Sequence, residues 1–302
     1  MESNETKELL QSMEERRASR RRAMLLGGAA LAGLALTSRQ ASAATVTDAD
    51  ILNFALNLEF LEAQYYTLAT TGMTIDVAAG ISTKSGSGSA GGTVVVKANP
   101  MVTFTDTSTQ DFALEIALDE QNHVKFLQSN LGTSAVAMPN IDLLNSFNAL
   151  AQAAGLGSSF DPFANETNFL LGAFIFEDVG VTAYQGAAGL ISSKTYLDKA
   201  VGIHNVEAYH AAGIRTRLFQ AGSAAQSASQ AIAMTRAKLD GTNNDDIGVS
   251  VMNNAATIVD APDTHAQTIG RTTAQVLSIV YGGGAAGTGG AFFPNGLNGT
   301  IR

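Results

Sequence analysis

Two short stretches of the chain place a glutamate three residues before a histidine. They are "DEQNH", which contains Glu120 and His123, and "VEAYH", which contains Glu207 and His210. On a helix, residues three apart lie on one face about one turn apart, so a carboxylate and an imidazole at this spacing can share a metal ion. A single Glu-x-x-His pair is weak evidence, because a solvated helix face contains it by chance. Two such pairs in one chain are harder to explain in that way.

Two further glutamates lie inside apolar helical runs, Glu59 in "LNLEFLEA" and Glu177 in "FIFEDVG". Burying an unpaired carboxylate there would cost several kcal/mol, and a bound cation removes that cost. Two-metal sites in helical bundles take one Glu from each of two helices and a Glu-x-x-His from each of the other two. We therefore predict a carboxylate-bridged centre for two iron or manganese ions. The predicted ligands are Glu59, Glu120, His123, Glu177, Glu207 and His210.

A tyrosine follows each of these buried glutamates at the same spacing. Tyr66 is seven residues after Glu59, and Tyr184 is seven residues after Glu177. Seven residues return a side chain to nearly the same helix face, two turns further on. The two helices therefore resemble copies of one element. We expect the tyrosine hydroxyls to bond to ligand carboxylates rather than to carry out redox chemistry.

A second carboxylate, Glu62, competes with Glu59, because "EFLE" places both within one turn. The match between the Tyr66 and Tyr184 spacings favours Glu59 as the ligand. Glu62 is then either a carboxylate beside the ligands or a surface residue, and the sequence leaves both options open.

Other polar residues near the motifs have weaker claims. His204 lies about 120° around the helix from His210, so it is expected to flank the site, with a role as an extra ligand left open. Asp119 and Asp178 each adjoin a predicted ligand and could orient it or face solvent. His265 lies in a polar loop and is given no role.

Four stretches with helical apolar periodicity would position these residues: about 47–71, a second that ends at Gly132, about 166–190 and about 195–220. Between the first two lies an insertion, 72–107. Its Gly/Ser tract and two β-branched runs, Thr93–Val96 and Val102–Thr105, predict a small β-hairpin. Residues 133–165 are long enough to cross the length of a bundle.

Four long helices, close pairing within each half and one long crossover predict an all-α four-helix bundle. The chain resembles the ferritin-like superfamily, and most nearly its exported, desiccation-related members. The bundle is expected over residues 44–221. Residues 222–302 are expected to form an irregular extension packed on the bundle, and "TTAQVLSIVYGG" and "GGAFFPNGLNG" are similar to the end of that subfamily. The resemblance implies a two-metal carboxylate site.

The first 43 residues have the pattern of an export signal. A basic segment with "SRRRAML" precedes the apolar run Ala23–Leu36, and Ala41-Ser42-Ala43 follows. The apolar run is too short to span a bilayer comfortably, and the arginines resemble a twin-arginine signal. We predict cleavage after Ala43, a periplasmic or extracellular location and no membrane segment afterwards. An ordinary secretion signal or an uncleaved anchor is the alternative.

Composition narrows the chemistry. Residues 1–43 contain seven of the 18 basic and five of the 27 acidic residues, which leaves 11 and 22 and a net charge of −11. This sign disfavours nucleic acid as a partner. The chain has no cysteine, which excludes disulfides, thiolate ligands and cysteine-ligated iron–sulfur clusters. Any metal must therefore be held by oxygen and imidazole donors.

The favoured function is an oxidoreductase site of ferroxidase or manganese-catalase type, with oxygen or hydrogen peroxide as a small-molecule oxidant. The alternative is a metal-free structural protein that protects other molecules of the cell envelope under stress. A homo-oligomer is compatible with the sequence. An iron-storage shell is less favoured, because the insertion and the extension would have to fit into every subunit contact.

Overall fold

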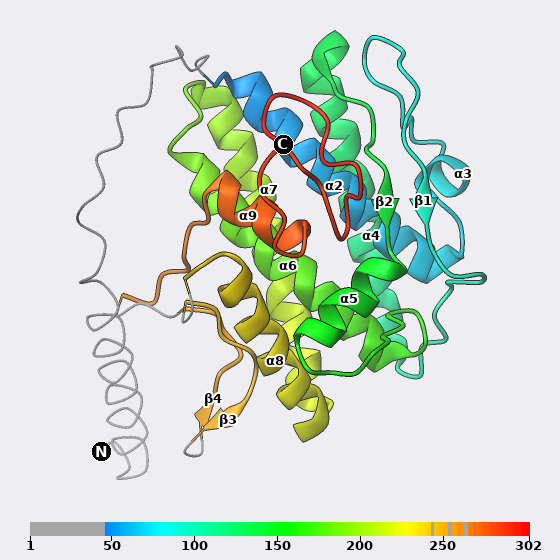
Figure 1. The fold of residues 1–302 in the computed structure, drawn as a ribbon, viewed down its shortest axis with the longest axis vertical. Coiled ribbons are helices and arrows are strands. Elements are labelled where there is room, and N and C mark those ends of the chain that lie inside the picture. Colours follow the sequence, from blue (N-terminus) through cyan, green and yellow to red (C-terminus); the bar gives the residue numbers. More distant parts are fainter. Residues whose placement is uncertain (1–45, 243–244, 253–254, 262–264) are drawn as a thin grey trace.

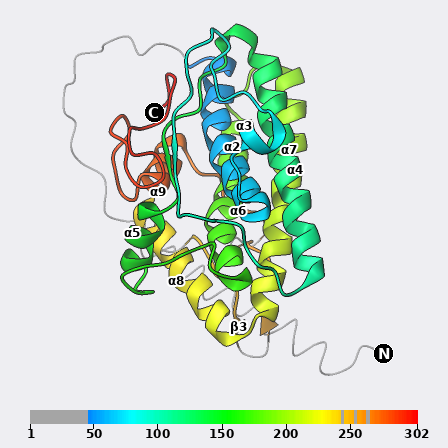
Figure 2. The same ribbon diagram turned by 90° about the vertical axis from the view of Figure 1, so that its right-hand side faces the viewer.

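The computed structural model describes residues 46–242, 245–252, 255–261 and 265–302, and the export signal predicted for residues 1–43 lies outside them. Four long helices run side by side along the long axis of the molecule (Figures 1 and 2). They are α2 (Asp48–Thr71), α4 (Thr107–Leu131), α6 (Glu166–Ala188) and α7 (Lys194–Gln220). The fold is the predicted all-α four-helix bundle.

Side-chain caps set where each long helix begins. Thr47 forms a capping box with Asp50 at the start of α2, and the Asp106 carboxylate accepts from the first backbone N–H groups of α4. Asn165 and Ser193 cap α6 and α7 in the same way. Each cap satisfies a backbone donor that has no partner inside the helix. These local signals explain why the predicted boundaries agree with the observed ones to within a few residues.

The four helices pack as two pairs around one core. Helix α2 packs along α4, and α6 packs along α7. Every residue of α6 from Phe169 to Ala183 is buried, as its apolar sequence predicts. One large cluster of aromatic and aliphatic side chains joins the helices, with Tyr65 stacked on Phe169. The buried glutamates and histidines therefore lie within a tightly packed apolar shell.

The predicted β-hairpin in the insertion is wrong. Strand β1 (Val94–Val95) pairs in parallel with β2 (Ile141–Asp142), which belongs to the crossover. The second β-branched run is used differently, because the Val102 N–H donates to the Ala69 carbonyl at the end of α2. That bond satisfies one of the carbonyls left free at the helix C-terminus, so the run cannot fold back on β1. The insertion also contains a short helix, α3 (Ile75–Ala79).

The crossover and the C-terminal residues cover the α6 side of the bundle. The crossover contains the 3₁₀ turn η1 (Gly132–Ser134) and helix α5 (Asn145–Ala153). After α7 come α8 (Ser223–Leu239), the short antiparallel pair β3 (Val251–Met252) and β4 (Ala255–Ala256), and α9 (Thr273–Val280). Both α8 and α9 contact α6, and α5 contacts α8.

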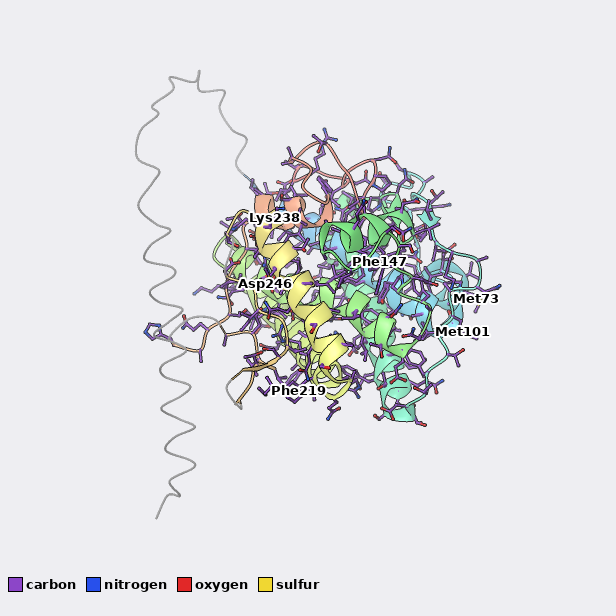
Figure 3. All side chains as sticks on the ribbon, turned by 60° about the horizontal axis from the view of Figure 1, so that its bottom comes forward. Met73, Met101, Phe147, Phe219, Lys238 and Asp246 are labelled. Carbon is purple, nitrogen blue, oxygen red and sulfur yellow. The ribbon has the colours of Figure 1, made fainter. Side chains whose placement is uncertain are left out.

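The insertion and the extension reach different sides of the molecule. In Figure 3, Met73 and Met101 of the insertion lie at one side, whereas Lys238 of α8 and Asp246 lie toward the other. The insertion and the extension therefore lie on different sides of the four long helices.

Among the described residues, no helix combines the length and the apolar character needed to cross a membrane.

Candidate metal centre

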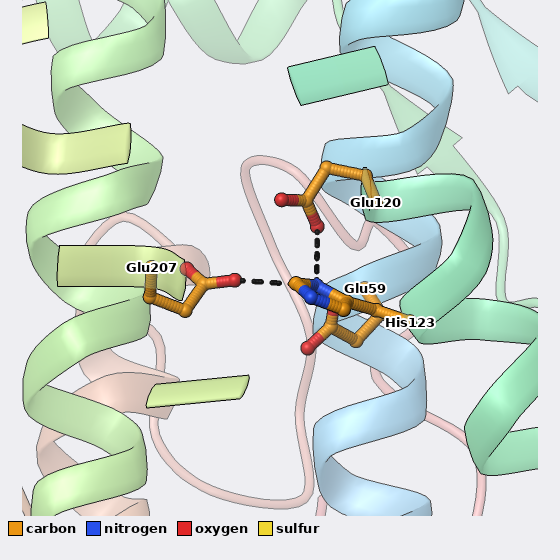
Figure 4. A group of neighbouring side chains, drawn as sticks. All are labelled: Glu59, Glu120, His123 and Glu207. Atoms are coloured by element: carbon orange, nitrogen blue, oxygen red, sulfur yellow. Dashed lines mark hydrogen bonds and ion pairs between the residues drawn. The ribbon is translucent and has the colours of Figure 1, made fainter. Parts of the chain in front are cut away.

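All six predicted ligands meet between the four long helices. Their donor atoms form two groups, and within each group the atoms lie within 4.8 Å of one another. The first group is Glu59, Glu120, His123 and Glu207, and the second is Glu120, Glu177, Glu207 and His210. Figure 4 shows the first group, with the His123 imidazole between the carboxylates of Glu120 and Glu207. Each of the four helices contributes at least one side chain.

Glu120 and Glu207 belong to both groups, so they occupy the positions of bridging carboxylates. The two oxygens of Glu120 face different imidazoles: Oε2 lies 3.4 Å from Nδ1 of His123, and Oε1 lies 3.1 Å from Nδ1 of His210. Glu59 and Glu177 each belong to one group, at opposite ends. This is the arrangement that two adjacent cations need, with shared oxygens between them and a carboxylate and an imidazole at each end.

Several donor atoms in the centre are buried without a hydrogen-bond partner. They are Glu120 Oε1, Glu177 Oε2, both carboxylate oxygens of Glu207 and His210 Nδ1. All of them except Glu207 Oε2 lie within 3.5 Å of an oppositely charged group, as pairs of a carboxylate oxygen and an imidazole nitrogen. Buried polar atoms are almost always satisfied, and each exception needs a cause. Cations placed between these atoms would satisfy all of them at once. The residues present therefore fit a pair of metal ions, and their oxygen and imidazole donors suit iron or manganese.

The tyrosines hold the end carboxylates crosswise. The Tyr66 hydroxyl of α2 donates to Glu177 of α6 at 2.5 Å, and the Tyr184 hydroxyl of α6 donates to Glu59 of α2. The expectation that the hydroxyls bond to these carboxylates is confirmed. Each tyrosine donates to the glutamate of the other helix rather than to the one on its own helix, so the two bonds between α2 and α6 are reciprocal.

The two imidazoles differ on their outer side. Nε2 of His210 bonds to Asp119 Oδ2 at 3.1 Å, which is the usual way a carboxylate fixes the ring of a metal-binding histidine. This supports the orienting role considered for Asp119. His123 directs Nδ1 toward Glu59 at 3.1 Å, and among the described residues nothing bonds to its Nε2.

Glu62 is a fifth buried glutamate and lies beside the centre. Of the two options that the sequence left open, it is therefore a carboxylate beside the ligands and not a surface residue. It is 6% exposed, and its Oε1 lies 3.6 Å from the point where a Cβ on Gly180 would be. The same Cβ would clash with Oε2 of Glu207. Gly180 thus leaves the space that Glu207 occupies, and Glu62 lines the same space without belonging to either donor group.

Burial dominates the electrostatics of the centre. It raises the pKa of Glu59 to about 7 and raises the pKa of Glu62, Glu177 and Glu207 above the usual range. Burial acts on Glu120 in the same direction, but the two imidazoles outweigh it and lower the pKa of Glu120. Burial disfavours the charged imidazoles, yet the surrounding carboxylates raise the pKa of His123 and His210 to about 12. Protons held by the imidazoles thus balance part of the carboxylate charge where no metal cation does.

Three further polar residues considered in the sequence lie outside the centre. Asp178 turns away from Glu177, and its Oδ2 accepts from Arg215 at 2.7 Å and from Arg236 at 2.8 Å. His204 is half-buried and belongs to neither donor group. His265, which was given no role, is exposed and also outside both groups.

The arginines that hold Asp178 were missed in the sequence. Arg236 also bonds to Asp246 through Nε at 2.8 Å, and Arg271 bonds to Asp246 and Asp240. This network ties the extension to α6. It also pairs with Asp178 and Asp246, two members of a third group of carboxylates that includes Asp260, so this group is a poorer metal site than the first two.

A four-helix bundle with this order of Glu and Glu-x-x-His donors defines the class of ferritin-like proteins. Comparison with known families agrees: residues 47–220 match the family described as "Ferritin-like domain", and the chain belongs to that family.

Two curated relatives share more than the bundle pattern. The chain is 32% identical over 180 residues to the desiccation-related protein PCC13-62 of Craterostigma plantagineum, a match that covers 58% of this chain and 54% of the relative. The chain thus matches only about half the length of that relative. It is 26% identical over 270 residues to the ferritin-like catalase Nec2 of Nesocodon mauritianus, with 84% of each chain covered. No solved structure gives a significant match.

Proposed function

We propose that this protein binds two iron or manganese ions and reacts with oxygen or hydrogen peroxide, with peroxide the better supported substrate. The observation that carries the proposal is the pair of donor groups that share Glu120 and Glu207. A protein that used these helices only as a scaffold would gain nothing from burying four carboxylates around two imidazoles.

The side chains have distinct tasks in such a centre. Glu120 and Glu207 would bridge the two ions, and Glu59 and Glu177 would bind one ion each, held in place by the Tyr184 and Tyr66 hydroxyls. The Asp119 carboxylate fixes the His210 ring. When bound, two iron or manganese ions supply open coordination positions and a change of oxidation state. The apolar shell excludes bulk water from this chemistry.

Peroxide is favoured over oxygen by one comparison. A relative that matches 84% of this chain is named a ferritin-like catalase. In the catalase reaction, two molecules of hydrogen peroxide give two of water and one of oxygen, so one peroxide is reduced and the other oxidised. Burial raises the pKa of Glu62, which lines the space beside Glu207, and we assign to this carboxyl the exchange of a proton with a reacting oxygen.

We also propose that the protein is exported through a twin-arginine signal in residues 1–43 and acts under oxidative or desiccation stress. The "SRRRAML" segment supports the route, since such signals export proteins that are already folded and could be loaded with metal. The similarity to a desiccation-related protein supports the setting.

Reconstitution tests the activity. The metal-free protein is loaded with Mn²⁺ or with Fe²⁺, and oxygen release from hydrogen peroxide is followed with an oxygen electrode. The loaded wild type is expected to release oxygen, and the equally folded Glu120→Gln variant is expected not to. A loaded wild type that consumes Fe²⁺ and oxygen but leaves peroxide untouched would make the protein a ferroxidase. A folded wild type that takes up neither metal would refute the proposal and favour the alternative, a metal-free structural protein.

A further inference from the structure

A surface groove leads to His123 between α4 and α7. It has a volume of about 410 Å³ and is lined by Phe126, Asp198, Lys199, Gly202, Ile203, Val206 and His123. We call it the α4–α7 groove. It is far larger than the ~10–15 Å³ that one water molecule needs. Its outer residues, Asp198 and Lys199, are exposed, whereas Ile203 and His123 are buried, so the groove runs inward from the surface.

The groove reaches the most exposed ligand of the centre. The His123 side chain is 10% exposed, whereas those of the other five candidate ligands are at most 4% exposed. His123 is also the imidazole whose Nε2 bonds to nothing among the described residues. The greater exposure of His123 and the absence of a bond to its Nε2 are both explained if Nε2 faces the groove. A solvent or substrate molecule would then bond to this nitrogen, as Asp119 bonds to Nε2 of His210.

Gly202 lines this groove and faces open space. Five glycines lie inside the four long helices, and at Gly172, Gly180, Gly186 and Gly213 an added Cβ would clash with a neighbouring atom. At Gly202 it would meet nothing within 4 Å. Glycine is among the poorest helix formers, so its presence in α7 needs a reason other than close packing. Open space in front of His123 is such a reason.

The lining indicates which molecules could pass. Phe126, Ile203 and Val206 offer no partner to a charge, and the Asp198 and Lys199 side chains at the rim lie 3.3 Å apart and neutralise each other. An ion would lose hydration along this wall without compensation. A small uncharged molecule of about two to four atoms has little hydration free energy to lose along the same wall.

We propose that the α4–α7 groove is the entrance to the metal centre, that it admits small uncharged oxidants such as hydrogen peroxide or oxygen, and that Gly202 sets its width. This inference rests on the proposed function, because it needs a metal centre for the oxidant to reach. It adds the route, the class of molecule admitted and the residue that controls access.

Nitric oxide provides a readout of access that is independent of turnover, since it is small, uncharged and binds ferrous iron with a change in absorbance. The protein is loaded with Fe²⁺ without oxygen, and nitric oxide binding is followed by stopped flow. Gly202→Ala adds little bulk and is expected to bind nitric oxide nearly as fast as wild type. Gly202→Leu fills the groove and is expected to bind it about tenfold more slowly or worse. Ala212→Leu adds nearly as much bulk to an exposed position of α7 outside the groove and should leave the rate unchanged.

The controls separate the possible failures. Both Gly202 variants should keep the wild-type iron content and unfold at the same temperature or higher, because alanine and leucine favour the helix more than glycine does. Equal rates of nitric oxide binding in wild type and in a folded, iron-loaded Gly202→Leu variant would refute the proposed entrance. The proposed metal centre would be unaffected by that result. A wild type that binds no iron, and so gives no nitric oxide signal, would instead refute the proposed function.

Discussion

Glu120 lies between two imidazoles, with Oε2 3.4 Å from Nδ1 of His123 and Oε1 3.1 Å from Nδ1 of His210. The two histidine rings are 6.4 Å apart between centroids. One carboxylate therefore faces the Nδ1 atoms of both Glu-x-x-His pairs, so the two donor groups form one continuous candidate centre.

Loss of either tyrosine hydroxyl should weaken the centre by a similar amount. Tyr66→Phe removes the bond to Glu177 and Tyr184→Phe the bond to Glu59, and each leaves a buried carboxylate oxygen unpaired. We expect the metal-free protein to lose about 1–3 kcal/mol of unfolding free energy in each case, measured with denaturant. Each variant should also bind metal about 10–100-fold more weakly. Unchanged stability and metal affinity in both variants would show that the crosswise bonds contribute nothing.

Asp119 should matter for one half of the centre only. Asp119→Asn leaves the fold intact but replaces the carboxylate that accepts from Nε2 of His210. We expect the affinity for one of the two metal ions to fall about 10–100-fold while the other is retained, as measured by competition with a chelator. Glu115→Gln, an exposed change on the same helix, is the matched control. Equal affinities in the two variants would remove Asp119 from the account.

Asp178 should behave as a structural residue although it adjoins Glu177. Asp178→Ala removes the carboxylate that pairs with the buried Arg215, whereas Arg236 keeps its second carboxylate, Asp246. Such an uncompensated charge typically costs about 3–5 kcal/mol, so thermal or denaturant unfolding should show a large loss of stability. Asp198→Ala, an exposed aspartate, should cost little. An Asp178→Ala protein of normal stability that has lost its metal would instead make Asp178 a ligand.

Metal affinity should rise with pH. The pKa of Glu59 is raised to about 7, and the pKa of His123 and His210 to about 12, so the metal-free centre holds protons that a bound cation must displace. Lower proton concentration makes that displacement easier, so the apparent affinity should increase from pH 6 to pH 8. Metal binding in weakly buffered solution should release protons, detectable with an indicator dye. Binding that neither depends on pH nor releases protons would contradict the electrostatic description of the site.

Much of the fold was predictable because each long helix contains its own boundaries and its own apolar stripe. Thr47 with Asp50 and Gly72 mark the ends of α2 in the sequence itself. The strand pairing was not predictable in this way, because β1 finds its partner Ile141–Asp142 in the crossover and the Val102 N–H bonds to α2 instead. Such long-range choices depend on where the helices place each segment.

The six candidate ligands were predictable because the spacing within a helix and the order of the motifs are sequence properties. The surroundings were not. Burial of Glu62 depends on the space left by Gly180, and the network of Arg236 with Asp178 and Asp246 joins α8 to α6 across a contact between distant segments. The crosswise tyrosine bonds likewise need both helices in place.

The most direct test of the central claim is the metal content of the protein purified without added metal, measured by elemental analysis against protein concentration. The wild type is predicted to contain close to two iron or manganese ions per chain. The folded variant with Glu120→Ala and His123→Ala is predicted to contain almost none, because it loses the shared carboxylate and one imidazole. A folded wild type with almost no metal, indistinguishable from that variant, would contradict the account.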